Sequence, residues 1–177
     1  QTYTVTSTIT FGANGTRKSP RGIRATAGFT VEPIINTTTV DIMNLAGYDY
    51  VQLQDLHVRR VSGNTKVCRF NGSLFVQVRR CNFEAQAGTG IIIEDLNVGT
   101  VLSECTIQNT GTASGTLIDS CSGGIVLDDC TLRGGTVTRS DLTFSRCKFD
   151  GASITVDNND VFLSCVLEPG AGMDGIK

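Results

Sequence analysis

The residues that could carry out acid/base chemistry in this sequence are carboxylates placed directly before recurring cysteines. Glu104 precedes Cys105, and Asp128 and Asp129 precede Cys130. Two carboxylates can act as general acid and base in glycoside hydrolysis, and converging carboxylate oxygens can bind Ca²⁺. Glu104, Asp128 and Asp129 are therefore the candidate catalytic residues.

Arginines occupy the equivalent places in other copies of the same phrase, where they could bind an acidic glycan. They are Arg79, Arg80 and Arg146. Opposite charges facing each other on neighbouring strands are mildly favourable. We expect the pairs Asp55–Arg80, Arg80–Glu104 and Asp129–Arg146. This pairing accounts for most of the carboxylates without catalysis, and only the step from Glu104 to Asp129 places like charges together.

Seven cysteines suggest disulfides or a metal site, but neither fits the pattern. The count is odd, no CxxC pair occurs, and His57 is the only histidine. Five cysteines share one position in a repeated phrase: Cys81, Cys105, Cys130, Cys147 and Cys165, with Leu56 at that position in an earlier copy. We interpret them as a buried column of reduced thiols, with Cys68 and Cys121 on or beside another strand, and we expect no metal or cofactor.

The phrase itself reads apolar-x-apolar-x-x-Cys-x-apolar. Copies occupy 76–83, 100–107, 125–132 and 142–149, and a shortened copy occupies 161–167. Alternation predicts strands with one buried face, and the two consecutive polar residues predict a bend between two of them. A third apolar run follows each phrase, for example GIIIEDL or GTLID. Units that recur after about 25 and later 17 or 18 residues indicate a solenoid of about seven or eight coils, each with three short strands.

The motifs VxLxDCTL, GTGIII and ASGTLI make the chain resemble the right-handed parallel β-helices of the pectin-lyase-like superfamily. The resemblance implies an all-β fold shared by polysaccharide lyases, glycoside hydrolases and viral tailspikes. We expect one domain over 1–177, less regular over 1–50 and regular over 51–177. The abrupt ends suggest part of a longer chain.

Composition excludes several functions. A net charge of −2 argues against nucleic acid as a partner, and no apolar run reaches the roughly 20 residues of a membrane span. Tryptophan is absent, so a rich sugar-stacking platform is not expected. His57 should be an outward surface residue, and the asparagines of three sequons, Asn14, Asn36 and Asn71, should lie in turns. The segment 12–22, with Arg17, Lys18 and Arg21 in it and Arg24 just beyond, reads as a solvated loop.

The second position of the phrase should face outward, yet it becomes apolar in later copies. Val101, Val126 and Phe162 are therefore predicted interface residues. Another copy of the rod is the simplest cover, and the resemblance to tailspikes implies a homotrimer about the long axis. A terminal segment folding back over the face is the alternative.

Two hypotheses for function follow. The first is a structural and adhesive virion protein of the tailspike, fibre or decoration type, assembled in the host cytoplasm, that binds virion partners or a host surface glycan. The second is a secreted enzyme of the same fold that degrades polysaccharide through Glu104, Asp128 and Asp129. The lack of long turn insertions after residue 51 favours the first, because polysaccharide-processing members generally build their grooves from such insertions.

Overall fold

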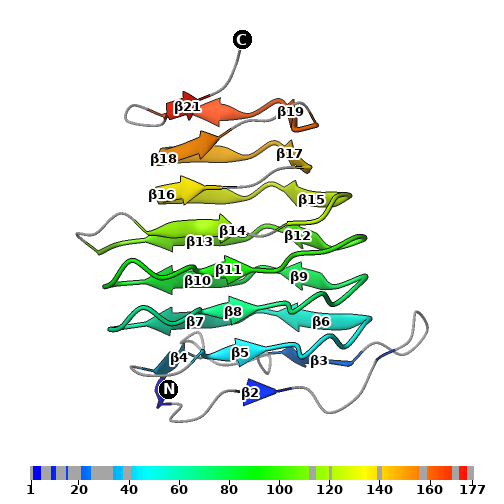
Figure 1. Ribbon diagram of the computed structural model, residues 1–177, viewed down its shortest axis with the longest axis vertical. Coiled ribbons are helices and arrows are strands. Elements are labelled where there is room, and N and C mark those ends of the chain that lie inside the picture. Colours follow the sequence, from blue (N-terminus) through cyan, green and yellow to red (C-terminus); the bar gives the residue numbers. More distant parts are fainter. Residues whose placement is uncertain are drawn as a thin grey trace.

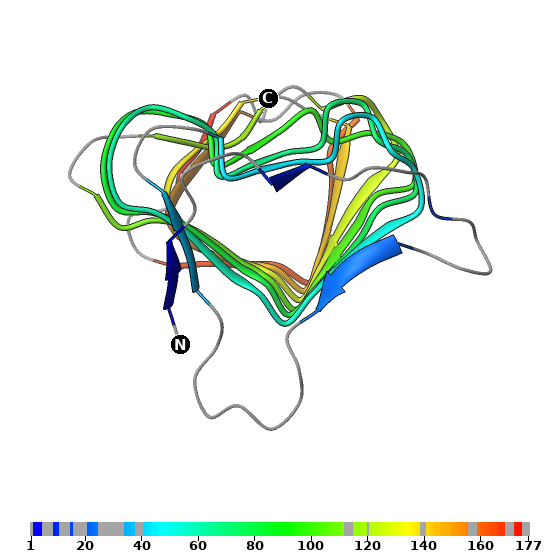
Figure 2. The same cartoon turned by 90° about the horizontal axis from the view of Figure 1, so that it is seen from below.

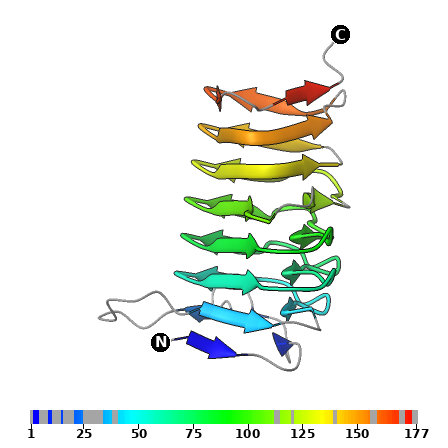
Figure 3. The same ribbon diagram turned by 90° about the vertical axis from the view of Figure 1, so that its left-hand side faces the viewer.

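The computed structural model of the chain describes residues 2–4, 9–10, 15, 21–24, 34–37, 41–111, 115–119, 121–138, 141–155, 159–168 and 172–174. All regular structure in these ranges is β-strand, which confirms the all-β class. The strands stack in parallel along the long axis as a β-solenoid (Figures 1 and 3). Within the same ranges no helical segment is long and apolar enough to cross a bilayer.

One sheet of seven parallel strands forms what we call the first face. In spatial order its strands are β3 (Arg21–Arg24), β6 (Val51–Gln54), β9 (Gln77–Arg79), β12 (Val101–Ser103), β15 (Ile125–Asp128), β17 (Leu142–Ser145) and β19 (Val161–Leu163). Each strand pairs only with equivalents one coil away. Residues about 25 positions apart in the long coils therefore become neighbours.

A 14-stranded sheet contains the other two faces. The second face comprises β1 (Thr2–Thr4), β4 (Ile34–Thr37), β7 (His57–Arg60), β10 (Asn82–Ala85), β13 (Thr106–Asn109), β20 (Val166–Leu167) and the first halves of β16 (Thr131–Val137) and β18 (Lys148–Thr155). The third face comprises β2 (Ile9–Thr10), β5 (Met43–Asn44), β8 (Cys68–Arg69), β11 (Ile93–Glu94), β14 (Thr116–Asp119), β21 (Gly172–Asp174) and the second halves of β16 and β18. Seen along the axis, the coils superimpose around one central core (Figure 2).

The core follows from the alternation in the sequence. On the first face, Leu53, Val78, Leu102, Leu127 and Phe144 point inward and are essentially inaccessible to solvent. The residues directly before and after each of them in the chain are exposed or half-buried. A strand with one buried face produces this period of two.

The two faces of the large sheet join where the coils shorten. In the longer coils, segments 61–67, 86–92 and 110–115 separate the second-face strand from the third-face strand. In the shorter coils this segment is missing, and β16 and β18 each run through the corner. Gly134 (φ +58°) and Gly151 (φ +62°) make the turn there, in a backbone region that side chains disfavour.

Candidate functional site

The bend between the first and second faces has the same backbone in each of the coils from β6 to β19. The residue before the cysteine position adopts a left-handed conformation with φ between +50° and +58°, at Asp55, Arg80, Glu104, Asp129, Arg146 and Ser164. This conformation costs an L-residue about 1–2 kcal/mol. Each of the first five residues donates its backbone N–H to a carbonyl of the following coil, so the stack holds the bend in place.

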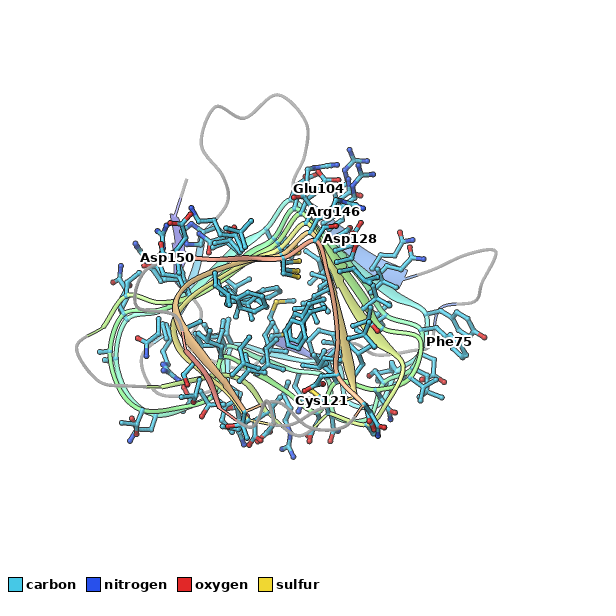
Figure 4. The ribbon with its side chains drawn as sticks, turned by 90° about the horizontal axis from the view of Figure 1, so that it is seen from above. Phe75, Glu104, Cys121, Asp128, Arg146 and Asp150 are labelled. Atoms are coloured by element: carbon cyan, nitrogen blue, oxygen red, sulfur yellow. The ribbon has the colours of Figure 1, made fainter. Side chains whose placement is uncertain are left out.

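Charged side chains gather outside this bend, and we call the group the charged ridge: Asp55, Arg79, Arg80, Glu104, Asp128, Asp129 and Arg146. Figure 4 shows Glu104, Asp128 and Arg146 together at this corner. The sequence therefore located the ridge correctly, at the two polar residues of the phrase.

Arginines bind the carboxylates of the ridge across neighbouring coils. Arg80 donates from Nε and Nη2 to the two oxygens of Asp55 at 2.6 and 3.0 Å, which confirms that predicted pair. Hydrogen bonding from Arg80 lowers the pKa of Asp55, despite the opposing effect of desolvation. Arg24 adds a longer contact to the same carboxylate at 3.4 Å.

At the other two predicted pairs the hydrogen-bond partner is a different residue. The Glu104 charge still acts on Arg80, whose pKa is raised first by the hydrogen bond to Asp55 and to a smaller extent by Glu104. Glu104 is bound by Arg79, through Nε and Nη2 at 3.1 and 3.0 Å, instead of by Arg80. Arg146 donates to Asp128 at 2.6 Å instead of to Asp129. Arg79 and Asp128 each stand one position before the bend residue and also point outward. They therefore compete with Arg80 and Asp129 for the partner in the neighbouring coil.

Two of the three candidate catalytic residues, Glu104 and Asp128, form ion pairs with arginines of neighbouring coils. Arg79 pairs with Glu104, and Arg146 pairs with Asp128. In the described part of the chain, no group of three His, Cys, Asp or Glu side chains could hold a metal ion. Exposed ion pairs of this type contribute about 0–1 kcal/mol each. Arg79, Arg80 and Arg146 are likewise engaged by carboxylates, so an acidic glycan would have to displace them.

The cysteine column lies just inside the ridge. All seven cysteines are free thiols, and Cys81, Cys105, Cys130 and Cys147 are buried in register with Leu56. Four thiols donate to a first-face carbonyl of the preceding coil: Cys105 to Val78 at 3.7 Å, Cys130 to Leu102 at 3.5 Å, Cys147 to Leu127 at 3.3 Å and Cys165 to Phe144 at 3.4 Å. The column is thus a packing element with weak hydrogen bonds along the axis.

The two cysteines outside the column also lie where expected. Cys68 is buried on β8, and Cys121 is half-buried just beyond β14. Burial raises the pKa of the Cys68 thiol, and burial together with nearby carboxylates raises that of Cys121 to about 12. Neither is an activated thiolate.

His57 is part of a polar cluster on the second face that the sequence did not predict. Its side chain is only 14% exposed, and Nε2 lies 2.9 Å from Oε2 of Glu84, itself 9% exposed. Thr110 and Gln86 donate to the other carboxylate oxygen at 2.9 and 3.2 Å. The outward direction of His57 was correct, but its solvent exposure was not, because Asn82 and Glu84 of the next coil contact its ring.

The charge state of this cluster follows from its donors. Burial would raise the pKa of Glu84, but hydrogen bonds from His57, Thr110 and Gln86 outweigh burial and lower it. An ionised carboxylate only accepts hydrogen bonds, so Nε2–H of His57 donates to Glu84. Glu84 therefore links three consecutive coils, through β7, β10 and the residue following β13.

A buried arginine lies at the end of the same strand as His57. Arg60 is fully inaccessible, and it donates from Nη1 to the Thr65 carbonyl and from Nη2 to that of Gly90 at 3.4 Å. Burial lowers its pKa, and Nε has no partner. Among the described residues no carboxylate forms an ion pair with it. Its role is to bind loop carbonyls inside the long coils.

The outward apolar file on the first face is present but differs at its end. In the strand register Val101 lies beside Val126, and Val126 lies beside Thr143. The Val101 side chain is 37% exposed. Phe162, predicted to continue this file, instead aligns with the inward Phe144 and stacks on it at 5.0 Å. Val161 takes the outward place, because it aligns with Thr143: the shortened phrase lacks its first apolar residue, before the apolar pair, and this register buries more of the aromatic ring.

The remaining expectations fall partly outside the described residues. Asn71 lies in an exposed turn at φ +52°, as expected for a turn asparagine. Arg17, Lys18 and Asn14, the side chains of Arg21 and Asn36, and the final Lys177 lie outside what the structure describes. A register alignment of second-face strands would have revealed the proximity of His57 and Glu84, since the two residues stand on adjacent strands.

Comparison with known proteins provides no relative: no family model matches the chain, and no curated protein or solved structure matches it.

Proposed function

We propose that this chain is a structural and adhesive rod of the kind found in bacteriophage tailspikes, fibres or decoration proteins. It is a right-handed parallel β-helix with three short strands per coil and about seven or eight coils. The handedness is the one that parallel strands with a crossover adopt almost without exception. The rod works as a homotrimer that binds other virion proteins or a glycan on the host surface.

The observation that carries this proposal is the exposed apolar file on the first face. Val101 and Val161 are 37% and 43% exposed, with Val126 and Thr143 between them, and Leu163 beside the end of this file is 52% exposed. An ordered strip of aliphatic side chains on a flat parallel sheet marks a surface that binds another molecule. Three copies around a common axis would each bury this strip, so that the predicted interface of Val101 and Val126 would extend past Thr143 to Val161 and Leu163.

The arginine-bound carboxylates support a structural role. Cross-coil ion pairs are compatible with a rod of regular coils, whereas a glycosidase needs one carboxylate free to protonate a leaving group and another free to act as base or nucleophile. Location in a virion assembled in the host cytoplasm suits seven reduced cysteines. Secretion as a polysaccharide-degrading enzyme is the alternative.

Sedimentation equilibrium tests the assembly. We expect a mass of three chains for the wild type, and a monomer for the Val101→Glu/Val161→Glu variant, because both side chains are already solvent-exposed in the single chain. Thr106→Glu on the half-buried outer side of the second face is the matched control and should remain a trimer. A monomeric wild type would contradict the proposal.

A viscosity assay with capsular and pectic polysaccharides tests the enzyme alternative. We expect no loss of viscosity with any of them. Depolymerisation that disappears in an Asp128→Asn/Asp129→Asn variant would establish the enzyme instead.

A further inference from the structure

Two aromatic rings lie outside the solenoid at the corner between the third and first faces. Tyr50 and Phe75 stack in parallel, with ring centroids 5.1 Å apart and an interplanar angle of 12°. Both residues have left-handed backbones, with φ of +54° and +56°. Bulky residues rarely adopt this conformation, and such strain concentrates at functional positions.

The corner holds the rings in fixed positions. Tyr50 N–H donates to the Leu74 carbonyl at 3.0 Å, and Leu74 N–H donates to Oδ1 of Asp49 at 2.8 Å. Phe75 N–H donates to the Val98 carbonyl at 3.1 Å. These bonds link three coils, so the aromatic pair is preorganised instead of being a mobile surface feature.

A glycine in the next coil makes room for the Phe75 ring. Gly99 occupies the position equivalent to Phe75 at φ +75°, and a Cβ at this position would overlap the ring atoms Cδ1 and Cε1. Phe75 nevertheless remains 44% exposed, and Figure 4 shows it projecting from the corner. The sequence thus places an aromatic ring over a glycine and leaves much of the ring in solvent.

An amide pair lies two residues after Tyr50 and Phe75 in the chain, on strands β6 and β9. Gln52 Nε2 donates to Oε1 of Gln77 at 2.9 Å on the outer side of β6 and β9. This bond leaves Oε1 of Gln52 as an acceptor and Nε2 of Gln77 as a donor, and neither atom has a further partner among the described residues. One free acceptor beside one free donor is complementary to neighbouring hydroxyl groups, which both donate and accept.

We propose that this corner, made of Tyr50, Phe75, Gln52 and Gln77, binds a neutral oligosaccharide. The apolar C–H face of a sugar ring packs on the exposed part of Phe75, while its hydroxyls bind the glutamine amides. All four side chains are uncharged, which favours a neutral sugar over an acidic one. The inference rests on the adhesive function proposed above and gives that function a site and a ligand class.

Affinity electrophoresis in native gels that contain dextran, mannan or galactan tests this site, with polygalacturonate as the acidic counterpart. We expect at least one neutral polysaccharide to retard the wild type. Gln77→Ala and Phe75→Asn should each weaken the apparent affinity at least tenfold. Asparagine tolerates a left-handed backbone, so relief of strain offsets the lost stack and the Tm of Phe75→Asn should stay within about 3 °C. Val166→Thr, an exposed aliphatic on the second face, is the control and should be retarded like the wild type.

The outcomes separate this site from the assembly. A trimer that no neutral polysaccharide retards overturns the site alone, and a retarded monomer overturns the trimer alone. Retardation that is unchanged in both variants places glycan binding elsewhere and also overturns the site. A change of sedimentation mass in Phe75→Asn, with no retardation of the wild type, shows that the exposed Phe75 contacts protein, which again overturns the proposal.

Discussion

The coils up to residue 130 and those that follow it share the first face and its corner with the second face, and they differ where the second face meets the third. Both have the left-handed bend, the charged ridge outside it and the thiol column inside it. The earlier coils add a segment between the second and third faces, lined by Arg60 and linked by Glu84. The later coils lack this segment and pack three phenylalanines, Phe144, Phe149 and Phe162, with ring centroids 5.0–6.1 Å apart.

This difference shows that coil length is not fixed by the stacking itself. Backbone pairing and the bend continue without interruption from β15 to β17 although the step falls from 25 to 17 residues. What changes is the source of stabilisation: polar contacts to loop carbonyls in the long coils, and aromatic packing in the short ones. Four substitutions test this contrast.

The largest effect is expected in the aromatic cluster of the short coils. Phe144→Ala leaves a cavity beside Phe149 and Phe162 and should lower the free energy of unfolding by about 3–5 kcal/mol. Urea denaturation measures the change. Phe144→Leu fills part of the cavity and should lose less than half as much stability as Phe144→Ala, and equal losses in both variants would contradict the packing argument.

Arg60 tests the long coils. Arg60→Ala leaves the carbonyls of Thr65 and Gly90 without their donor and should cost about 2–3 kcal/mol in urea denaturation. Arg133→Ala, which removes an exposed ion pair to Asp150 in a short coil, is the matched control at about 0.5 kcal/mol. Similar values for the two arginines would remove the contrast between the regions.

The glycines at the fused corner give a smaller and more local effect. Gly134→Ala should cost about 2 kcal/mol, because the left-handed backbone disfavours alanine and the new Cβ meets the Asn109 carbonyl of the last long coil at 2.6 Å. Gly151→Ala has the same backbone problem but open space around the Cβ, so about 1 kcal/mol is expected. Thermal unfolding of the two variants measures the difference. A larger loss of stability in Gly151→Ala than in Gly134→Ala would show that the contact with the Asn109 carbonyl does not add to the cost.

The smallest effect is a pH dependence from Glu84. Its pKa is lower in the folded chain than its ordinary value of 4.5, so its stabilisation is fully present above about pH 4.5 and is lost as pH falls through the folded pKa. Glu84→Gln should therefore be less stable than wild type at pH 7, with a difference that shrinks in acid. Urea midpoints between pH 7 and pH 3 measure it. Glu168→Gln, at an exposed pair with Lys148, is the control and should change little.

The sequence predicted the fold further than it predicted the candidate site. Alternation and the repeated cysteine located the strands of the first face, the bend and the buried column, because each depends on residues within one phrase. The partners of Glu104 and Arg146 depended on two outward positions that compete for the same neighbour, which the phrase cannot rank. The burial of His57 required knowledge of the Asn82 and Glu84 side chains that contact it from the next coil.

Phe162 shows the same limit inside a single phrase. A copy with one residue missing can be aligned with the loss before or after the apolar pair, and the two choices place the ring on opposite sides of the sheet. Only the register against β17, which lets Phe162 stack on Phe144, decided between them.

The sequence by itself determined that this chain forms stacked parallel strands with a column of thiols at one corner, since period-two alternation and recurring spacing act locally. The tertiary structure alone decided which side chains meet from coil to coil: Arg79 with Glu104, His57 with Glu84, and Tyr50 with Phe75. These pairs are about 25 residues apart, and their contacts depend on register and backbone direction at the corners, which no single phrase specifies.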